Sequence, residues 1–299
     1  MKIYLFLAFT LLFWACESKK GPTKEDYEEN IENLAAGIIE ISDENIRNII
    51  NSIPSPLEIS FLIHDTGIQY DKSKLSSGNN VSRYNSNDKR ALNLGIYGTD
   101  LGYTDIYSQS QDGIEYLTAI KKLADDLGIG QYFSFDLIQK LTESGDNLDS
   151  LLLVTSDNFN RINDHFQEQN RSALSVLLLL GGWIESLHLT CQVTLQQMDN
   201  KNLRERIGEQ KIILENMTIL LEVYSKEDHY FESLMKQMSE LEAAFEEVEI
   251  IYTYAESTSE VIDGVLVIKD NSTSEVKISD ENVIEIARVT ENFRNSVTE

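Results

Sequence analysis

Basic residues are scarce in this sequence. Its 299 residues include 25 Lys and Arg against 50 Asp and Glu, which gives a formal net charge of -25 at pH 7. Nucleic acids and anionic lipid headgroups repel such a polyanion, so the sequence excludes binding to either of them through charge. We expect no nucleic-acid partner. Three roles remain for the negative charge: attraction of cationic partners, binding of divalent cations, and solubility. A solvated acidic surface is the plainest of these interpretations.

The sequence also lacks the common catalytic motifs. It contains no G-x-S-x-G, no H-E-x-x-H, no C-x-x-C and no glycine-rich phosphate loop. The acidic runs Glu25–Glu29 and Glu246–Glu249 do not have the spacing of a calcium-binding loop. We therefore expect no enzymatic activity, no cofactor and no bound metal.

Charged side chains are almost absent from the first fifteen residues, where Lys2 is the single ionisable one. An apolar run from Ile3 follows and ends at the small residue Ala15. This layout is typical of a secretory signal. The run is shorter than the roughly 20 residues of a membrane-spanning helix, so residues 1–15 are predicted to be a cleaved signal peptide.

Cysteine is rare as well, since Cys16 and Cys191 are the only two. Cys16 directly follows the apolar run and Ala15, an arrangement that resembles the lipobox of bacterial lipoproteins. The resemblance implies that Cys16 becomes the acylated N-terminus, and each buried acyl methylene contributes about 0.8 kcal/mol to membrane binding. The alternative is an ordinary signal peptide with an incidental cysteine. With Cys16 acylated, Cys191 has no thiol partner and is interpreted as a small buried hydrophobe.

Residues 16–23 are predicted to be the lipidated cysteine and a short polar tether that contains Gly21 and Pro22. Surface-exported lipoproteins of Bacteroidota carry acidic residues after the lipidated cysteine, whereas this tether carries Lys19 and Lys20. We therefore expect an outer-membrane anchor with the periplasmic side favoured over the cell surface. The expected partners are the lipid bilayer, through Cys16, and another protein of the envelope.

Apolar residues recur at helical spacing along most of residues 24–299, which predicts one all-α domain, a multi-helix bundle. The predicted helices cover residues 23–39, 42–52, 56–67, 89–109, 111–127, 133–142, 148–169, 170–196, 202–225, 228–254 and 280–295. The block from Ala173 to Ile184 is apolar on all sides, so its helix is expected at the centre.

Two segments depart from the helical period. Alternation in residues 261–268 and 275–278 predicts a small β-hairpin before the last helix, joined by Asp270, Asn271 and Ser272. The polar stretch from Asp71 to Asn87 is predicted to be a long surface loop, and its length makes it a candidate functional loop.

Glycine is spaced at three and four residues in one predicted helix, at Gly95, Gly98 and Gly102. Each glycine destabilises a helix by about 1 kcal/mol relative to alanine. We therefore expect these three to form a stripe without side chains, against which a second helix can pack closely. If the stripe packs against Gly181 and Gly182, polar groups of both helices would meet in one interior pocket. The candidate ligand-binding residues are Asp100, Tyr103, Asp105, Trp183, Glu185 and His188.

Glu185 and His188 form an E-x-x-H pair on one helix face, as in di-iron bundles. Such bundles need a second E-x-x-H motif, and none of the other three histidines has an acid three residues before it. The plainer interpretation is a buried polar pair that is satisfied by hydrogen bonds from the glycine-containing helix.

The residues around Ile53–Glu58 and Ala91–Tyr103 resemble those of uncharacterised helical lipoproteins of Bacteroidota, and the resemblance implies an envelope lipoprotein without catalytic residues. The first hypothesis is therefore a non-enzymatic binding or structural protein that uses its acidic helical surface or the loop at 71–87. The second is a helical module that binds a small ligand or a metal near Asp100, Glu185 and His188. An enzyme is the least favoured of the three.

Overall fold

The computed structural model describes residue 49 and residues 62–133, 135, 136, 140, 161–226, 228–262, 265–269 and 271–299. Of residues 260–262 and 265–269 only the backbone is described. All of these residues lie in the second of two units, Met1–Asp43 and Glu44–Glu299. The predicted signal peptide, Cys16, the tether and the helices predicted at 23–39 and 42–52 fall outside the described residues, apart from Ile49.

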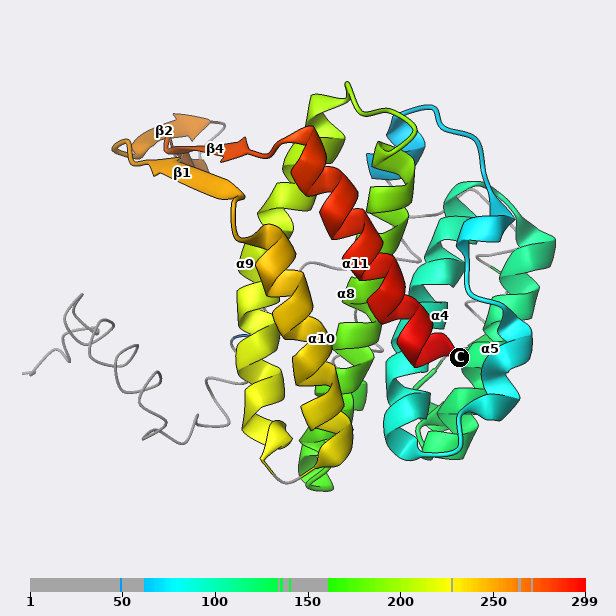
Figure 1. The fold of residues 1–299 in the computed structure, drawn as a ribbon. Helices are drawn as coiled ribbons and strands as arrows, with labels where there is room; N and C mark the ends of the chain where they lie inside the picture. The colour runs from blue at the N-terminus through cyan, green and yellow to red at the C-terminus, as the bar shows by residue number, and fades with distance from the viewer. Residues whose placement is uncertain are drawn as a thin grey trace, which may run out of the picture. The chain divides into compact units, whose positions relative to one another are not determined.

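The described residues confirm the predicted fold class, an all-α bundle with a small β-hairpin before the last helix (Figure 1). Helix α8, Ser172–Thr194, packs against α4, Asn87–Ile106, and against two later helices, α9 and α11. It is long and apolar enough to cross a membrane, but 94% of its most apolar window is buried within the protein. A buried core helix is expected to have this composition, as predicted for the block at 173–184.

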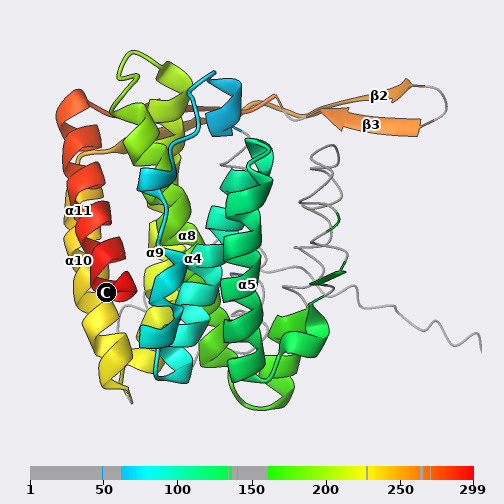
Figure 2. The same cartoon turned by 90° about the vertical axis from the view of Figure 1, so that its right-hand side faces the viewer.

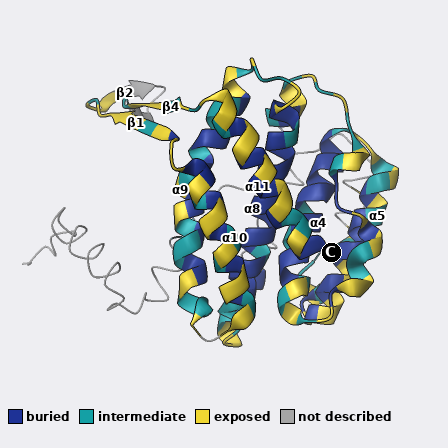
Figure 3. Ribbon diagram, viewed as in Figure 1, coloured by how far each residue is buried: buried dark blue, intermediate teal, exposed yellow. Residues whose placement is uncertain are grey.

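The remaining helices surround this pair. Helix α5, Ser110–Leu127, lies beside α4 and ends at Gly128, whose φ of 75° is left-handed. Helices α9, Lys201–Ser225, and α10, His229–Phe245, form the predicted antiparallel pair, and α11, Asp280–Thr298, packs on both α8 and α10. Figure 3 shows that α10 and α11 keep an exposed outer face, whereas α4 and α8 are buried along most of their length.

Close contact between α4 and α8 depends on two glycines. A Cβ atom at Gly95 would lie 2.0 Å from the carbonyl oxygen of Leu178, and one at Gly181 would lie 1.8 Å from that of Leu92. The predicted contact between the two helices is confirmed at these positions. The prediction is wrong for Gly98, because a Cβ atom there would have no neighbour within 4 Å.

The helix predicted at 228–254 is too long. It ends at Phe245, and strand β1, Glu249–Thr253, follows after a short turn. The sequence of β1 is rich in β-branched and aromatic residues, which favour strands over helices. The acidic turn at Glu246 and Glu247 therefore separates two elements that the sequence analysis had joined.

Strands β1 to β4 form a long two-stranded ribbon, which we call the β-arm (residues 249–277). β2, Thr258–Ile262, pairs with β3, Val265–Lys269, and β1 pairs with β4, Thr273–Lys277, both antiparallel. Figure 2 shows β2 and β3 projecting sideways from the bundle, near one end of the helices. The arm is joined to the bundle at its base, where Val248 and Val276 pack on Gly208 of α9.

The predicted connection of this hairpin is wrong. The prediction paired residues 261–268 with residues 275–278 through residues 270–272. In the structure, Ile262 of β2 is the partner of Val265 of β3, so the hairpin connection in the sequence is Asp263-Gly264. Asp-Gly is a favoured two-residue hairpin connection, and the predicted strand at 261–268 in fact contains it. Residues 270–272 instead lie between β3 and β4 on the returning side of the ribbon.

The segment from Asp71 to Asn87 lies largely at the surface, as predicted, with eight of its seventeen residues exposed, but it is more ordered than a plain loop. It contains two short 3₁₀ helices, Lys72–Lys74 and Gly78–Arg83. Leu75, Ser76 and Tyr84 are each at most 7% exposed. These buried side chains anchor a surface segment to the bundle, so it is not a free loop.

Candidate functional site

The interior site begins with an ion pair between α8 and α11. The guanidinium group of Arg294 donates from Nε to Oε2 of Glu185 at 2.9 Å and from Nη2 to Oε1 at 3.0 Å. The side chain of Glu185 is fully buried and that of Arg294 is 11% exposed. Such a two-bond pair fixes the orientation of both groups, so it joins the last helix to the central one.

Asp100 of α4 is the third charged residue of the site. Its side chain is buried, and its Oδ2 accepts a hydrogen bond of 3.2 Å from the backbone N–H of Ser76. Burial and the nearby Glu185 carboxylate raise the pKa of Asp100 well above its usual value, although Arg294 opposes the shift. When Asp100 is protonated it can donate to Glu185, and the three residues then carry no net charge.

Arg294 remains charged in this setting. Burial alone would lower the pKa of its guanidinium group, but the attraction of Glu185, their hydrogen bonds and Asp100 together raise it. Burying a charged group is tolerated when it is paired and hydrogen-bonded. The site is therefore a buried ion pair with a neutral carboxyl group beside it.

Residues 74–77 cover the ion pair from the third side. The carbonyl oxygen of Lys74 accepts from Arg294 at 3.3 Å, and that of Ser76 accepts from the hydroxyl group of Tyr116 at 2.8 Å. The hydroxyl group of Tyr97 donates to the carbonyl oxygen of Ser77 at 2.9 Å. Tyrosines of α4 and α5 thus hold this segment over the site.

His188 lies one helical turn after Glu185 and is 4% exposed. Burial lowers the pKa of its ring, while the Glu185 carboxylate partly opposes that shift. Among the described residues, no group of three histidine, cysteine or acidic side chains could hold a metal ion. Arg294 donates to both carboxylate oxygens of Glu185, so the acid of the E-x-x-H motif belongs to an ion pair in this structure.

Three buried polar atoms in this region have no hydrogen-bond partner: Ser76 Oγ, Asp100 Oδ1 and His188 Nδ1. Buried polar atoms in proteins nearly always have a partner, and ordered water commonly supplies it. A protonated Asp100 accounts for its own Oδ1 by donating to Glu185, which leaves Ser76 Oγ and His188 Nδ1 as the atoms that a water molecule would satisfy.

The other predicted residues lie apart from this cluster. Trp183 donates from its indole N–H to Oε1 of Gln210 at 3.0 Å, so it joins α8 to α9. Tyr103 packs among tyrosines, with ring centroids 5.5 Å from Tyr70 and 4.9 Å from Tyr107. Asp105 is buried on α4. The structure therefore brings Asp100, Glu185 and His188 together but not the other three.

Sequence analysis missed Arg294, the residue that completes the site. A signal was present, because Ala287, Thr290, Arg294 and Val297 recur at helical spacing and share the face of α11 that meets the bundle. A cation on an otherwise apolar face indicates a buried partner. The covering segment gave no comparable signal, because Ser76 and Ser77 contribute through their backbone.

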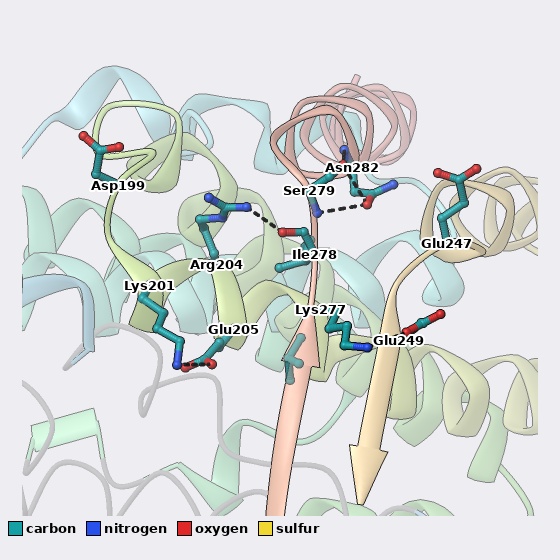
Figure 4. Close-up of a pocket in the computed structure, with 11 residues that line it drawn as sticks. Asp199, Lys201, Arg204, Glu205, Glu247, Glu249, Lys277, Ile278, Ser279 and Asn282 are labelled. Atoms are coloured by element: carbon teal, nitrogen blue, oxygen red, sulfur yellow. Dashed lines mark hydrogen bonds and ion pairs between the residues drawn. The ribbon is translucent and has the colours of Figure 1, made fainter.

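A surface depression of about 610 Å³ lies at the base of the β-arm (Figure 4). Each cation that lines it has an acidic partner: Lys201 with Glu205 at 3.2 Å, Arg204 with Asp280 at 2.8 Å, and Lys277 with Glu249 at 3.3 Å. The lining residues are Asp199, Lys201, Arg204, Glu205, Glu247, Glu249, Val276, Lys277, Ile278, Ser279 and Asn282. The Arg204–Asp280 pair joins α9 to α11 and the Lys277–Glu249 pair joins β4 to β1, while Arg204 also donates to the carbonyl oxygen of Ile278 at the base of the arm.

No family model matches the chain, and no curated protein or solved structure matches it.

Proposed function

We propose that this chain is a non-enzymatic envelope lipoprotein, held on the outer membrane through acylated Cys16, that binds a protein partner through its β-arm. The N-terminal pattern of Lys2, the apolar run and Cys16 supports the anchor. The helical bundle is then the rigid base that presents the arm.

Exposed apolar side chains on the β-arm carry this proposal. Ile251, Tyr252 and Tyr254 are 38%, 64% and 73% exposed, and all three lie within four residues. Tyrosine is enriched at protein interfaces because it offers a large apolar ring and a hydrogen-bonding hydroxyl group. A two-stranded ribbon is only marginally stable alone in water, so a partner that covers it would also stabilise it.

The interior site supports a structural role for the charged residues of the bundle. Glu185 and Arg294 satisfy each other, and Asp100 is neutral beside them. The covering segment at 74–77 is held by Tyr97 and Tyr116, so the ion pair is enclosed. Each member of the pair is needed because its loss would leave the other charge buried without a partner, which supports a role in fixing how the helices pack.

Site-specific photo-crosslinking in living cells tests the binding role. A photoreactive amino acid at position 252 should give a discrete crosslinked product. The matched control is position 284 on α11, because Ile284 is similarly exposed at 54% but lies outside the arm. Equal products at both positions, or none at position 252, would contradict the proposal.

Membrane fractionation tests the anchor. Cys16→Ser should move the protein from the detergent-extracted membrane fraction to the soluble fraction, because an acyl chain cannot attach to that serine. Protease added to intact cells should leave the native protein whole until the outer membrane is ruptured. Degradation in intact cells would place the protein on the cell surface.

A second candidate function is the binding of a small polar molecule beside the ion pair. It is favoured by the unpartnered Ser76 Oγ and His188 Nδ1 atoms. Native mass spectrometry of the purified chain would show a stoichiometric mass excess if such a molecule is retained. A mass equal to that of the acylated chain alone would leave water as the occupant.

A further inference from the structure

The two sides of the β-arm differ in charge. Residues 249–262 carry three acidic side chains, Glu249, Glu256 and Glu260, and no basic one. The returning side, residues 265–277, carries two acids, Asp270 and Glu275, and two lysines, Lys269 and Lys277, of which Lys277 pairs with Glu249 across the ribbon. The outgoing side is therefore the acidic side of the arm.

The strand edges of the arm are open. Among the described residues, each of the four strands has a single neighbouring strand, which leaves one edge of every strand without a backbone partner. Proteins commonly protect such edges with lysine or proline. The returning side has two lysines, whereas the outgoing side has neither lysine nor proline, so its edge is the less protected one.

The arm is also held in a defined shape before any partner binds. Four residues separate β1 from β2, but only three separate β3 from β4, so the outgoing side carries one extra residue, as in a β-bulge. Asn271 donates to the carbonyl oxygen of Glu256 at 2.8 Å, and the Ser272 hydroxyl group lies 3.3 Å from the backbone N–H of Ala255. These bonds across the bulge keep β1 and β2 on one continuous ribbon.

The exposed aromatic residues lie on this same side. Tyr252 lies in β1 and Tyr254 directly follows the strand, and both are largely exposed. An added strand at this edge would place its own apolar side chains beside these rings, and its cationic side chains near the glutamates. Cross-strand pairs of both kinds stabilise sheets.

We propose that the outgoing edge of the β-arm, residues 249–262, binds an extended cationic segment of a partner protein as an additional β-strand. The inference rests on the proposed protein-binding function and names the chemistry of its partner. A second copy of the chain is disfavoured because it would place acidic strands together. An anionic membrane surface is disfavoured for the same reason.

Peptide binding to the purified full-length chain tests this inference. The probe is a fluorescent ten-residue peptide of alternating valine and lysine. One comparison peptide carries proline at its centre, which removes a strand hydrogen bond, and another carries glutamate in place of lysine. We expect binding of the lysine peptide, at least about tenfold weaker binding of the proline peptide, and none of the glutamate peptide.

Two charge-reversal variants locate the binding edge. Glu256→Lys on the outgoing side and Glu275→Lys on the returning side change the net charge equally, and both side chains are exposed. Glu256→Lys should weaken binding about fivefold, and Glu275→Lys less than about twofold. Equal weakening by both variants, or equal binding of the proline peptide, would show only general attraction to an acidic protein and would overturn the inference.

Other occupants give different results. Sedimentation that detects a dimer lost in Glu256→Lys, or binding to phosphatidylglycerol vesicles that is lost with Tyr252→Ser, would assign the edge to a second copy or to a membrane and overturn the inference. A discrete crosslink at position 252 together with no peptide binding would reject the cationic strand alone. No crosslink would reject the binding function itself.

Discussion

At the scale of single residues, the carboxyl group of Asp100 is buried beside Glu185 and Arg294. Burial and the neighbouring carboxylate raise its pKa in the folded state, whereas the unfolded chain has the ordinary value of about 3.9. The folded state therefore binds more protons than the unfolded state between these two pKa values. The free energy of unfolding therefore falls as the pH rises through this interval, by up to about 1.4 kcal/mol per pH unit.

Asp100→Asn should remove this dependence. The amide has the shape of the protonated carboxyl group, can accept from the Ser76 N–H and can donate to Glu185. Between pH 5 and pH 7, the free energy of unfolding of the variant should improve relative to the native chain by about 1–3 kcal/mol. Urea unfolding at both pH values measures the difference, and parallel pH profiles would contradict the raised pKa of Asp100.

Removing one member of the Glu185–Arg294 pair should destabilise the fold strongly. Replacing both members with apolar residues should change the stability little. Arg294→Met leaves a carboxylate buried without its partner, which typically destabilises a protein by about 3–5 kcal/mol. Adding Glu185→Leu removes that charge, so the double variant should regain most of the loss. Thermal or urea unfolding of the two single variants and the double variant measures the coupling. Additive losses would show that the two residues act independently.

The polar residues of this site on α4 and α8 were predicted from the sequence, and the cation on the last helix was not. Asp100, Glu185 and His188 were conspicuous as polar groups on apolar helices. Arg294 lies 109 residues after Glu185, and no local pattern states which helix its face will meet. Trp183 was placed in the wrong site because its position on α8 does not show whether its side chain faces α4 or α9.

At the scale of elements, the contact between α4 and α8 depends on backbone approach at Gly95 and Gly181. Gly95→Ala would press its methyl group against the backbone of α8, so the helices would have to separate. We expect a loss of about 1–3 kcal/mol in the free energy of unfolding, as for other overpacked cores.

Gly98 on the same helix is the matched control for that substitution, because a Cβ atom there has open space. Gly98→Ala should leave stability unchanged or raise it by up to about 1 kcal/mol through helix propensity. Urea unfolding of both alanine variants gives the comparison. An equal loss for the two would mean that propensity or solvation, and not the close approach, sets the effect.

Element boundaries were predictable where capping residues and periodicity agree. The last helix begins after Ser279, whose side chain forms a capping box with Asn282, and the expected start at Asp280 is confirmed. The β-arm was only partly predicted, because an apolar run from Val261 to Ile268 resembles one strand. Its Asp263-Gly264 dipeptide was the decisive signal, since Ile262 and Val265 are paired.

At the scale of the whole molecule, the net charge of -25 affects the stability of the fold in a way that no single ion pair determines. The described surface ion pairs, such as Lys72 with Asp112 at 2.6 Å, are exposed and each contribute at most about 1 kcal/mol. Repulsion among the excess acids acts over longer distances and opposes the compact state. The buried Glu185–Arg294 pair is shielded from added ions by its burial.

Added salt should therefore stabilise this protein. Raising NaCl from about 10 mM to about 0.1 M shortens the screening length from about 30 Å to about 10 Å, which weakens repulsion between distant acids more than attraction within close pairs. A gain of about 1 kcal/mol would raise the Tm by about 2–4 °C for a domain of this size. Thermal unfolding followed by circular dichroism measures it, with sucrose at matched osmolality as the uncharged control. A Tm that falls with NaCl would mean that attraction within the surface ion pairs outweighs the net repulsion. The folded state would then need bound counterions or a cationic partner to offset its excess of acidic side chains.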